Sequence, residues 1–156
     1  MTTGTEPVTG GCQCGRIRYE IAGGAEPVSI CHCRMCQRAS GNLFLAIVPV
    51  PHESFRWLNG APETYASSTI ANRDFCASCG TPLSFRFVEG DFICLGVGTL
   101  DDPEWTPRPG RHVGAESRVS WFHEMMAWPV RTSDENESIT PERRARFVSH
   151  QGDPDG

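Results

Sequence analysis

The sequence predicts a small all-β domain, and three observations support that prediction. The chain has 156 residues, the size of one ordinary domain that encloses its own hydrophobic core. Its 16 Gly and 12 Pro favour short strands separated by turns over long helices. Short apolar or alternating segments recur between those turns. A sandwich, a barrel or a folded sheet would satisfy all three observations.

The folded domain is expected at residues 10–132, after a flexible leader at residues 1–9. The pair Gly10-Gly11 marks the start of the ordered part. The first strand is expected at residues 16–21, where polar and apolar residues alternate as in a strand with one buried face.

The next strand is expected in an apolar run at residues 43–50. This run is short for a helix and ends at Pro51, so a buried strand explains it better. Turn residues such as Asn59-Gly60 and Glu89-Gly90-Asp91 separate the segments that follow. Four more strands are expected, at residues 55–58, 63–67, 83–88 and 92–97.

The end of the chain, residues 133–156, is expected to be a polar tail with one short helix. Thr140 is a suitable N-cap, Pro141 suits the first helical position, and Glu142 favours the positive end of the helix dipole. Before the tail, we expect Trp121 and Trp128 to pack in the core.

Charge and hydropathy exclude two classes of partner. Lys and Arg number 14 against 19 Asp and Glu, a formal net charge of −5, so no broad positive field attracts nucleic acid or anionic lipid. The sequence has neither a signal-peptide pattern nor an apolar run of about 18 residues. We therefore expect a soluble, cytoplasmic protein that acts on a small molecule.

Eight cysteines carry the strongest chemical signal. In a reducing cytosol, closely spaced cysteine pairs indicate metal binding or redox chemistry rather than a disulfide framework. The alternative is a secreted, disulfide-bonded protein. The spacing favours metal, because two nearby thiolates supply half of a tetrahedral zinc shell at little cost in chain entropy.

Two of the pairs together predict a closed, structural zinc site. Cys76 and Cys79 are separated by two residues, which permits a tight turn, and Gly80 follows. Cys12 and Cys14 would lie on one side of an extended chain, and the flanking glycines allow the bend that brings both sulfurs to one ion. Four thiolates fill the shell of zinc.

A third group, Cys31, Cys33 and Cys36, supplies three thiolates and lacks an obvious fourth. Three protein ligands with one exchangeable position are typical of a catalytic zinc. Arg34 and Arg38 lie beside this group and either offset thiolate charge or are ordinary exposed arginines. Beyond these ligands, no catalytic residue is assigned.

The remaining Cys and His residues are weaker candidates. Cys94 has apolar neighbours and is interpreted as a core cysteine rather than a fourth ligand. His32 lies between two expected ligands and is expected to point away from them in an extended segment. The histidines show neither H-x-E nor H-E-x-x-H spacing, which excludes the deaminase and zincin classes.

The combined pattern closely resembles the family of glutathione-dependent formaldehyde-activating enzymes and centromere protein V, over roughly residues 10–130. The motifs that carry the resemblance are Gly11-Cys12-x-Cys14-Gly15, Cys31-His32-Cys33-x-x-Cys36, Phe75-Cys76-x-x-Cys79-Gly80, Leu100-Asp101-Asp102-Pro103 and the segment from His112 to Trp121. The combination is specific, whereas a single cysteine pair is not.

The resemblance implies a folded sheet called the β-tent, similar to the Mss4-like fold, stapled by two zinc ions. It implies the same division of ligands: Cys12, Cys14, Cys76 and Cys79 for the structural ion, and Cys31, Cys33 and Cys36 for the catalytic ion. It also implies an activity that joins formaldehyde to glutathione, which belongs to the carbon-sulfur lyases.

The leading hypothesis is therefore a zinc-dependent carbon-sulfur lyase that acts on a glutathione-type thiol adduct of formaldehyde or another small electrophile. The alternative is a non-catalytic zinc module that binds another macromolecule through its sheet. A third hypothesis is redox sensing, in which the three clustered thiolates oxidise and release zinc.

Overall fold

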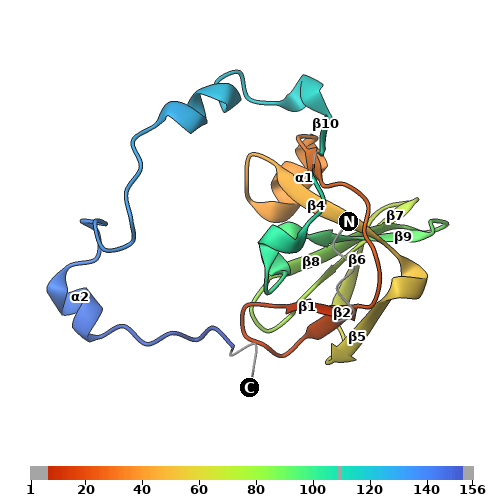
Figure 1. The fold of residues 1–156 in the computed structure, drawn as a ribbon, viewed down its shortest axis with the longest axis horizontal. Coiled ribbons are helices and arrows are strands. Elements are labelled where there is room, and N and C mark those ends of the chain that lie inside the picture. Colours follow the sequence, from red (N-terminus) through yellow and green to blue (C-terminus); the bar gives the residue numbers. More distant parts are fainter. Residues whose placement is uncertain (1–6, 109, 153–156) are drawn as a thin grey trace. The chain divides into compact units, whose positions relative to one another are not determined.

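The structure, a computed structural model, describes residues 7–108 and 110–152. It confirms the all-β fold class, with one three-stranded and one seven-stranded sheet (Figure 1). The strands are β1 (Val8–Gly11), β2 (Arg18–Ile21), β3 (Ser29–Cys31), β4 (Leu45–Pro51), β5 (Phe55–Asn59), β6 (Glu63–Ser68), β7 (Ala71–Phe75), β8 (Pro82–Phe87), β9 (Phe92–Gly96) and β10 (Arg111–Val113). The α-helices are α1 (Arg34–Ser40) and α2 (Pro141–Ala145).

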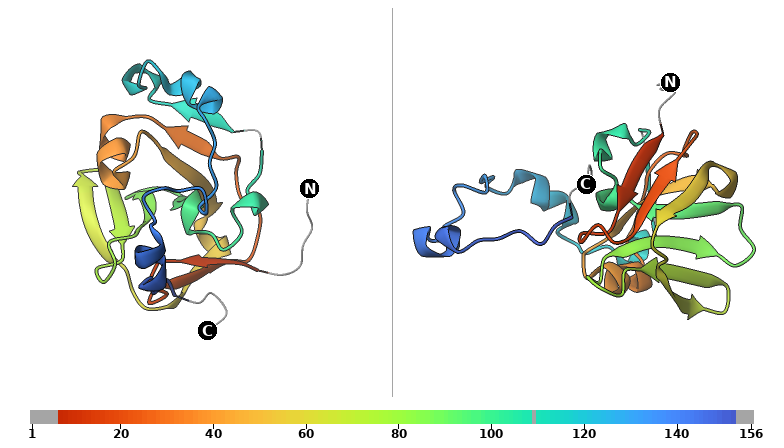
Figure 2. Two further views of the ribbon diagram at one scale, coloured as in Figure 1. Left: turned by 90° about the vertical axis from the view of Figure 1, so that its left-hand side faces the viewer. Right: turned by 90° about the horizontal axis from the view of Figure 1, so that it is seen from below.

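The small sheet has the order β1-β2-β5, and the large sheet has the order β10-β3-β4-β9-β8-β7-β6. Figure 2 shows the red and orange strands β1 and β2 beside the green strands of the large sheet. Both sheets contribute to one core. Its buried side chains are Ile17, Tyr19 and Ile21 from the small sheet region and Val48, Val50, Leu83, Ile93 and Leu95 from the large sheet.

Alternation of apolar side chains explains the strands that the sequence predicts. In β2, Tyr19 and Ile21 are buried, and the alternate residues Arg18 and Glu20 are half-buried. All six expected strands overlap an observed one, namely β2, β4, β5, β6, β8 and β9. The other four strands are short or lack an apolar pattern, and β7 is the clearest case because its sequence is Ala-Asn-Arg-Asp-Phe. Pairing with β6 and β8 forms this strand despite its weak pattern.

One strand pair departs from the antiparallel pattern of the sheets. β10 pairs parallel with β3, and His112 lies opposite Ile30. The backbone N–H of His32 continues this contact by donating to the carbonyl of Val113 at 2.9 Å. The edge strand β10 of the large sheet thus holds the segment that follows β3 in place.

Helix α1 follows this segment and was not expected from the sequence. Its N-cap is Cys33, whose sulfur accepts a hydrogen bond from the backbone N–H of Cys36. The helix ends at Gly41, which has φ of 64° and donates its N–H to the carbonyl of Gln37. A thiol in place of the usual hydroxyl or carboxylate cap hides this start from sequence rules.

Residues 119–150 form a separate compact unit with little regular structure. The short helix expected in the tail is present as α2, and the side chain of its N-cap Thr140 accepts from the backbone N–H of Arg143. The expectation that Trp121 and Trp128 pack in the core is wrong. Their rings stack on each other at 5.4 Å, and Trp128 is 51% exposed. The two tryptophan rings therefore cover each other instead of being buried in the hydrophobic core.

Among the described residues, no helix combines the length and the apolar character needed to cross a membrane.

Candidate metal centres

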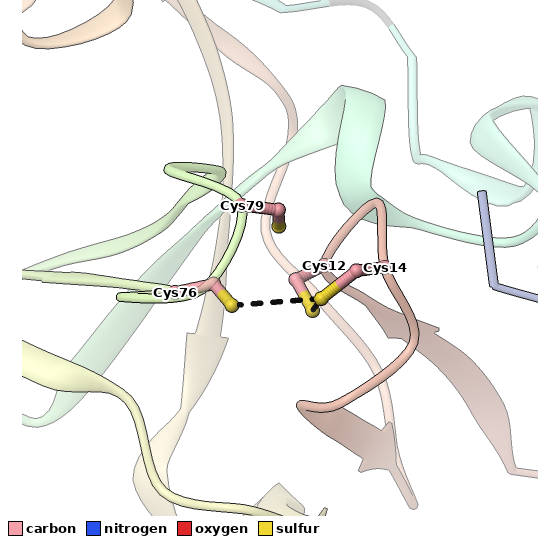
Figure 3. Close-up of side chains that lie close together, drawn as sticks. All are labelled: Cys12, Cys14, Cys76 and Cys79. Carbon is pink, nitrogen blue, oxygen red and sulfur yellow. Dashed lines mark hydrogen bonds between the residues drawn. The ribbon is translucent and has the colours of Figure 1, made fainter. Parts of the chain in front are cut away.

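Four cysteines from two distant turns meet in the first cluster. Cys12 and Cys14 come from the turn after β1, and Cys76 and Cys79 come from the turn between β7 and β8. Their four sulfurs all lie within 4.8 Å of one another, and Figure 3 shows them pointing toward a common centre. The cluster joins the beginning of the domain to its middle.

Tight backbone turns bring the sulfurs of this cluster together. The N–H of Gly80 donates to the carbonyl of Cys76 at 2.8 Å, and Gly80 has φ of 77°, which L side chains rarely adopt. On the other side, the N–H of Gly15 donates to the carbonyl of Cys12 at 3.0 Å. Both turns reverse the chain so that each cysteine pair faces the other.

The sulfur spacing of the first cluster fits a tetrahedral zinc ion. A Zn–S bond of about 2.3 Å places tetrahedral sulfurs about 3.8 Å apart. Two of the Sγ–Sγ distances are 3.5 Å, between Cys12 and Cys14, and 3.9 Å, between Cys14 and Cys76, and all the others are at most 4.8 Å. Cys12 and Cys76 are also buried, as is typical of a closed site. The donor set and its geometry therefore fit the metal that the sequence indicates.

The thiols of this cluster differ in acidity. Burial raises the pKa of the Cys79 thiol, but hydrogen bonds from Thr81 and from neighbouring groups outweigh burial and lower this pKa to about 6. A hydrogen bond from the backbone of Arg16 lowers the pKa of the Cys14 thiol. Burial and the neighbouring thiols outweigh that bond and raise this pKa to about 11. Several thiolates this close repel one another, and a divalent cation removes that repulsion.

The second cluster contains three cysteines at the junction of β3 and α1. Cys31 ends β3, Cys33 caps α1, and Cys36 lies in the first turn of the helix. Their sulfurs also lie within 4.8 Å of one another. Among the described residues, no fourth Cys, His, Asp or Glu joins this group, and Cys94 stays outside it. This donor set fits a metal ion with one position left for another ligand.

Electrostatics distinguish two of these sulfurs, those of Cys31 and Cys33. Burial raises the pKa of Cys31 to about 12. Burial opposes ionisation of Cys33 as well, but the N–H of Cys36 and the adjacent thiols outweigh it and lower the pKa of Cys33. A thiolate at the start of a helix is favoured because unpaired N–H groups point toward it.

Arg73 of β7 is a functional candidate that sequence reasoning missed. Its Nη2 donates to the Sγ of Cys36 at 3.3 Å, and its guanidinium lies over the ring of Phe85 at 5.0 Å. This cation offsets negative charge on the cluster. In the sequence, Arg73 lies three residues before Cys76, a member of the first cluster. Nothing in that position indicates a contact with the second cluster. The contact depends on strand pairing.

Arg34 and Arg38 flank the second cluster in the sequence. Among the hydrogen bonds of the described residues, neither arginine donates to the sulfurs of this cluster. Arg34 donates to the side chain of Gln37. Arg38 is exposed and lines a pocket next to the helix. The charge beside Cys36 thus comes from β7 and not from the local segment.

His32 points away from the cysteine sulfurs. It is fully buried, and its Nε2 lies 2.9 Å from the Nδ1 of His112 on β10. The two rings stack with centroids 5.2 Å apart. His32 is not part of the three-cysteine group. Its position helps to fix the loop that carries Cys31 and Cys33 against the edge strand.

A pocket of about 450 Å³ adjoins the second cluster. Helix α1 contributes Met35, Arg38 and Ala39 to its lining, and the large sheet contributes residues of β4, β6, β7, β8 and β9. Arg73 belongs to both the pocket and the cluster because it lines the former and contacts Cys36 in the latter. A ligand in this pocket would lie against Arg73, whose guanidinium contacts the sulfur of Cys36.

Comparison with known proteins adds three findings. The family model described as "Glutathione-dependent formaldehyde-activating enzyme" matches residues 7–115. An uncharacterized lyase of Schizosaccharomyces pombe is 33% identical over 81 residues, which are 52% of this chain and 58% of that protein. A crystal structure of a Rhodobacter sphaeroides protein superposes with a TM-score of 0.52 at 20% identity, and the match covers 66% of this chain and 98% of the other. The last finding concerns the fold alone.

Proposed function

Because this chain belongs to the glutathione-dependent formaldehyde-activating enzyme family, we propose that it is a zinc-dependent carbon-sulfur lyase. Its substrate is a glutathione-type thiol adduct of formaldehyde or of another small electrophile. The observation that carries the proposal is the cluster of Cys31, Cys33 and Cys36, which offers three sulfurs to a metal beside a pocket. The lyase name of the Schizosaccharomyces pombe relative supports the reaction class.

The reaction makes or breaks one carbon-sulfur bond. In one direction the thiol sulfur bonds to the carbonyl carbon, and the thiol proton ends on the former carbonyl oxygen. In the other direction that bond breaks and the proton returns to sulfur. Zinc held by the second cluster supplies a Lewis acid that lowers the pKa of a thiol.

The residues of this chain have three roles in the proposal. The end of β3 and the start of α1 fix the three sulfurs in one place. The guanidinium of Arg73 offsets negative charge next to Cys36. The pocket orients the substrate and limits the water around the reacting atoms.

The first cluster has a structural role in the same proposal. The four sulfurs of Cys12, Cys14, Cys76 and Cys79 lie close enough to hold one ion, and they would give a second zinc ion a complete set of four thiolates. That ion would fasten the turn after β1 to the turn after β7. The protein therefore carries two zinc ions with different tasks.

Metal analysis combined with turnover tests this proposal. The purified protein is expected to contain two zinc ions and to accelerate exchange between formaldehyde, glutathione and their adduct, measured by NMR. Cys33→Ser is expected to lose one zinc ion and the acceleration while it retains the other zinc ion and the fold. Cys94→Ser, the same substitution outside both clusters, is the control for metal content alone and keeps two zinc ions. Full activity of folded Cys33→Ser would refute the proposal.

A further inference from the structure

The pocket beside α1 has a lining that the proposed reaction with formaldehyde does not require. One side of the large sheet forms its floor, with Leu45 and Ile47 of β4 and Pro82 of β8. Met35 and Ala39 of α1 form the opposite wall. These five side chains are apolar and border a volume of about 450 Å³. Such a volume is in the range of pockets that bind drug-sized molecules.

The pocket reaches residues next to the second cluster, although none of the three cysteines is among its described lining residues. Met35 precedes Cys36 directly in the helix, and Arg73 joins the sulfur of Cys36 to the pocket lining. Gly96 of β9 lies opposite Ile47 and adds no side chain to the lining. A group attached to a sulfur at the cluster therefore has an apolar space next to it.

The charged residues of the lining are few. Among the described lining residues, they are Arg38, Arg73 and Asp74. The carboxylate of Asp74 already accepts hydrogen bonds from Ser84 and Thr64, and it also pairs with Arg86. The peptide of glutathione has several amide groups and charged ends that need polar partners when buried. Hydroxyl groups of Tyr65 and Ser67 also line the pocket, but its apolar side chains match a hydrocarbon group better than that peptide.

We infer that the pocket binds the electrophile part of the adduct and that this part carries a medium-length alkyl chain or a ring. The inference rests on the proposed function and narrows its substrate class. Formaldehyde contributes one carbon and would leave most of the apolar lining in contact with water. A larger aldehyde buries that lining, and each added methylene favours binding. Arg38, exposed at the rim, is placed to meet a carboxylate of the thiol carrier outside the pocket.

Two unreactive thioethers test this inference in the zinc-loaded protein. S-hexylglutathione and S-methylglutathione share the peptide and differ in the group on sulfur. Calorimetry is expected to show that the hexyl compound binds at least about tenfold more tightly, because the pocket buries its chain. Ala39→Trp, which fills the pocket from an exposed position of the helix, is expected to abolish that preference. Ala39→Ser is the matched control and retains the preference.

Each other outcome contradicts the inference in a distinguishable way. Equal affinity of the two compounds in the wild-type protein would show that the pocket does not receive the electrophile, while the proposed reaction would stand. An equal loss of both compounds in Ala39→Trp would place the glutathione peptide in the pocket instead. Failure of both compounds to bind the wild-type protein would overturn the proposed function together with the inference.

Discussion

The two cysteine clusters use the same side chain in different surroundings. The first takes four sulfurs from two tight turns that are far apart in sequence, so its shell is complete within the chain. The second takes three sulfurs from six consecutive residues and borders a pocket. Donor number thus separates a site suited to holding the fold from a site suited to chemistry.

The largest expected effect comes from the first cluster. Cys76→Ser removes a buried ligand, so zinc that contributes directly to stability is lost. We expect the free energy of unfolding to fall by about 4 kcal/mol or more, and part of the protein to be unfolded at 37 °C. Urea denaturation followed by tryptophan fluorescence and far-UV circular dichroism measures the change. A loss below that of Cys94→Ser would contradict a structural role for this cluster.

Loss of a ligand of the second cluster should reduce activity more than stability. Cys36→Ser is expected to decrease kcat/KM for adduct formation about 100-fold or more, because the metal site loses one of its three ligands. The melting temperature is expected to change less than in Cys76→Ser. Parallel calorimetric scans and NMR exchange rates on both variants make the comparison. Equal melting losses in the two variants would remove the distinction between the clusters.

Arg73 allows a finer test of the second cluster. Arg73→Met removes the cation 3.3 Å from the sulfur of Cys36 and keeps much of the side-chain volume. Metal affinity of the second cluster is expected to fall about tenfold. Competition with a chromophoric chelator measures this affinity separately for the labile and the tightly bound ion.

Two further variants control the Arg73 experiment. Arg73→Lys retains a charge and is expected to restore part of the affinity. Arg56→Met removes an exposed arginine that pairs with Glu20 on the small sheet, and it is expected to leave both metal sites unchanged. A fall in the affinity of the first cluster in Arg73→Met would indicate general loss of structure instead.

The smallest expected effect concerns an ion pair that supports the small sheet near the first cluster. Arg18 of β2 donates to Asp101 and lowers the pKa of that carboxyl, and Thr9 of β1 adds a hydrogen bond. Because the folded pKa is lowered, this contribution is present above the unfolded value near 3.9 and is lost as the pH falls through the folded value.

Asp101→Asn should reproduce that loss at neutral pH. The side chains of Arg18 and Asp101 are 17% and 28% exposed, so solvent limits the contribution to about 1 kcal/mol. Denaturation curves of the wild type and the variant are expected to differ at pH 7 and to converge as the pH falls below the folded pKa of Asp101. A constant difference across that range would assign the effect to packing rather than to charge.

Sequence reasoning recovered those features that depend on local pattern. Alternation located β2, and a capping residue followed by proline located α2. Cysteine spacing and the coordination number of zinc predicted two groups of sulfurs, and the structure brings the same cysteines within 4.8 Å of one another. Each turn that closes a pair is encoded within a few residues. The assignment of zinc to these groups stays a prediction.

The features that were missed depend on contacts between distant segments. Helix α1 begins at a cysteine cap, which propensity rules do not recognise. Arg73 reaches Cys36 only because β7 lies within the large sheet, 37 residues away in sequence. The pocket likewise requires the helix and five strands in place. No local signal indicates any of these arrangements.

The parallel pair of β3 and β10 has a consequence for the order of folding. Ser29 accepts a hydrogen bond from Arg111, which lies 82 residues later in the chain. Loop closure over that distance is slow relative to the hairpins between β6 and β9. During synthesis the segment that carries the second cluster therefore lacks its outer neighbour until residue 113 has left the ribosome. Metal that arrives before then meets three cysteines on a segment that has not yet paired with β10.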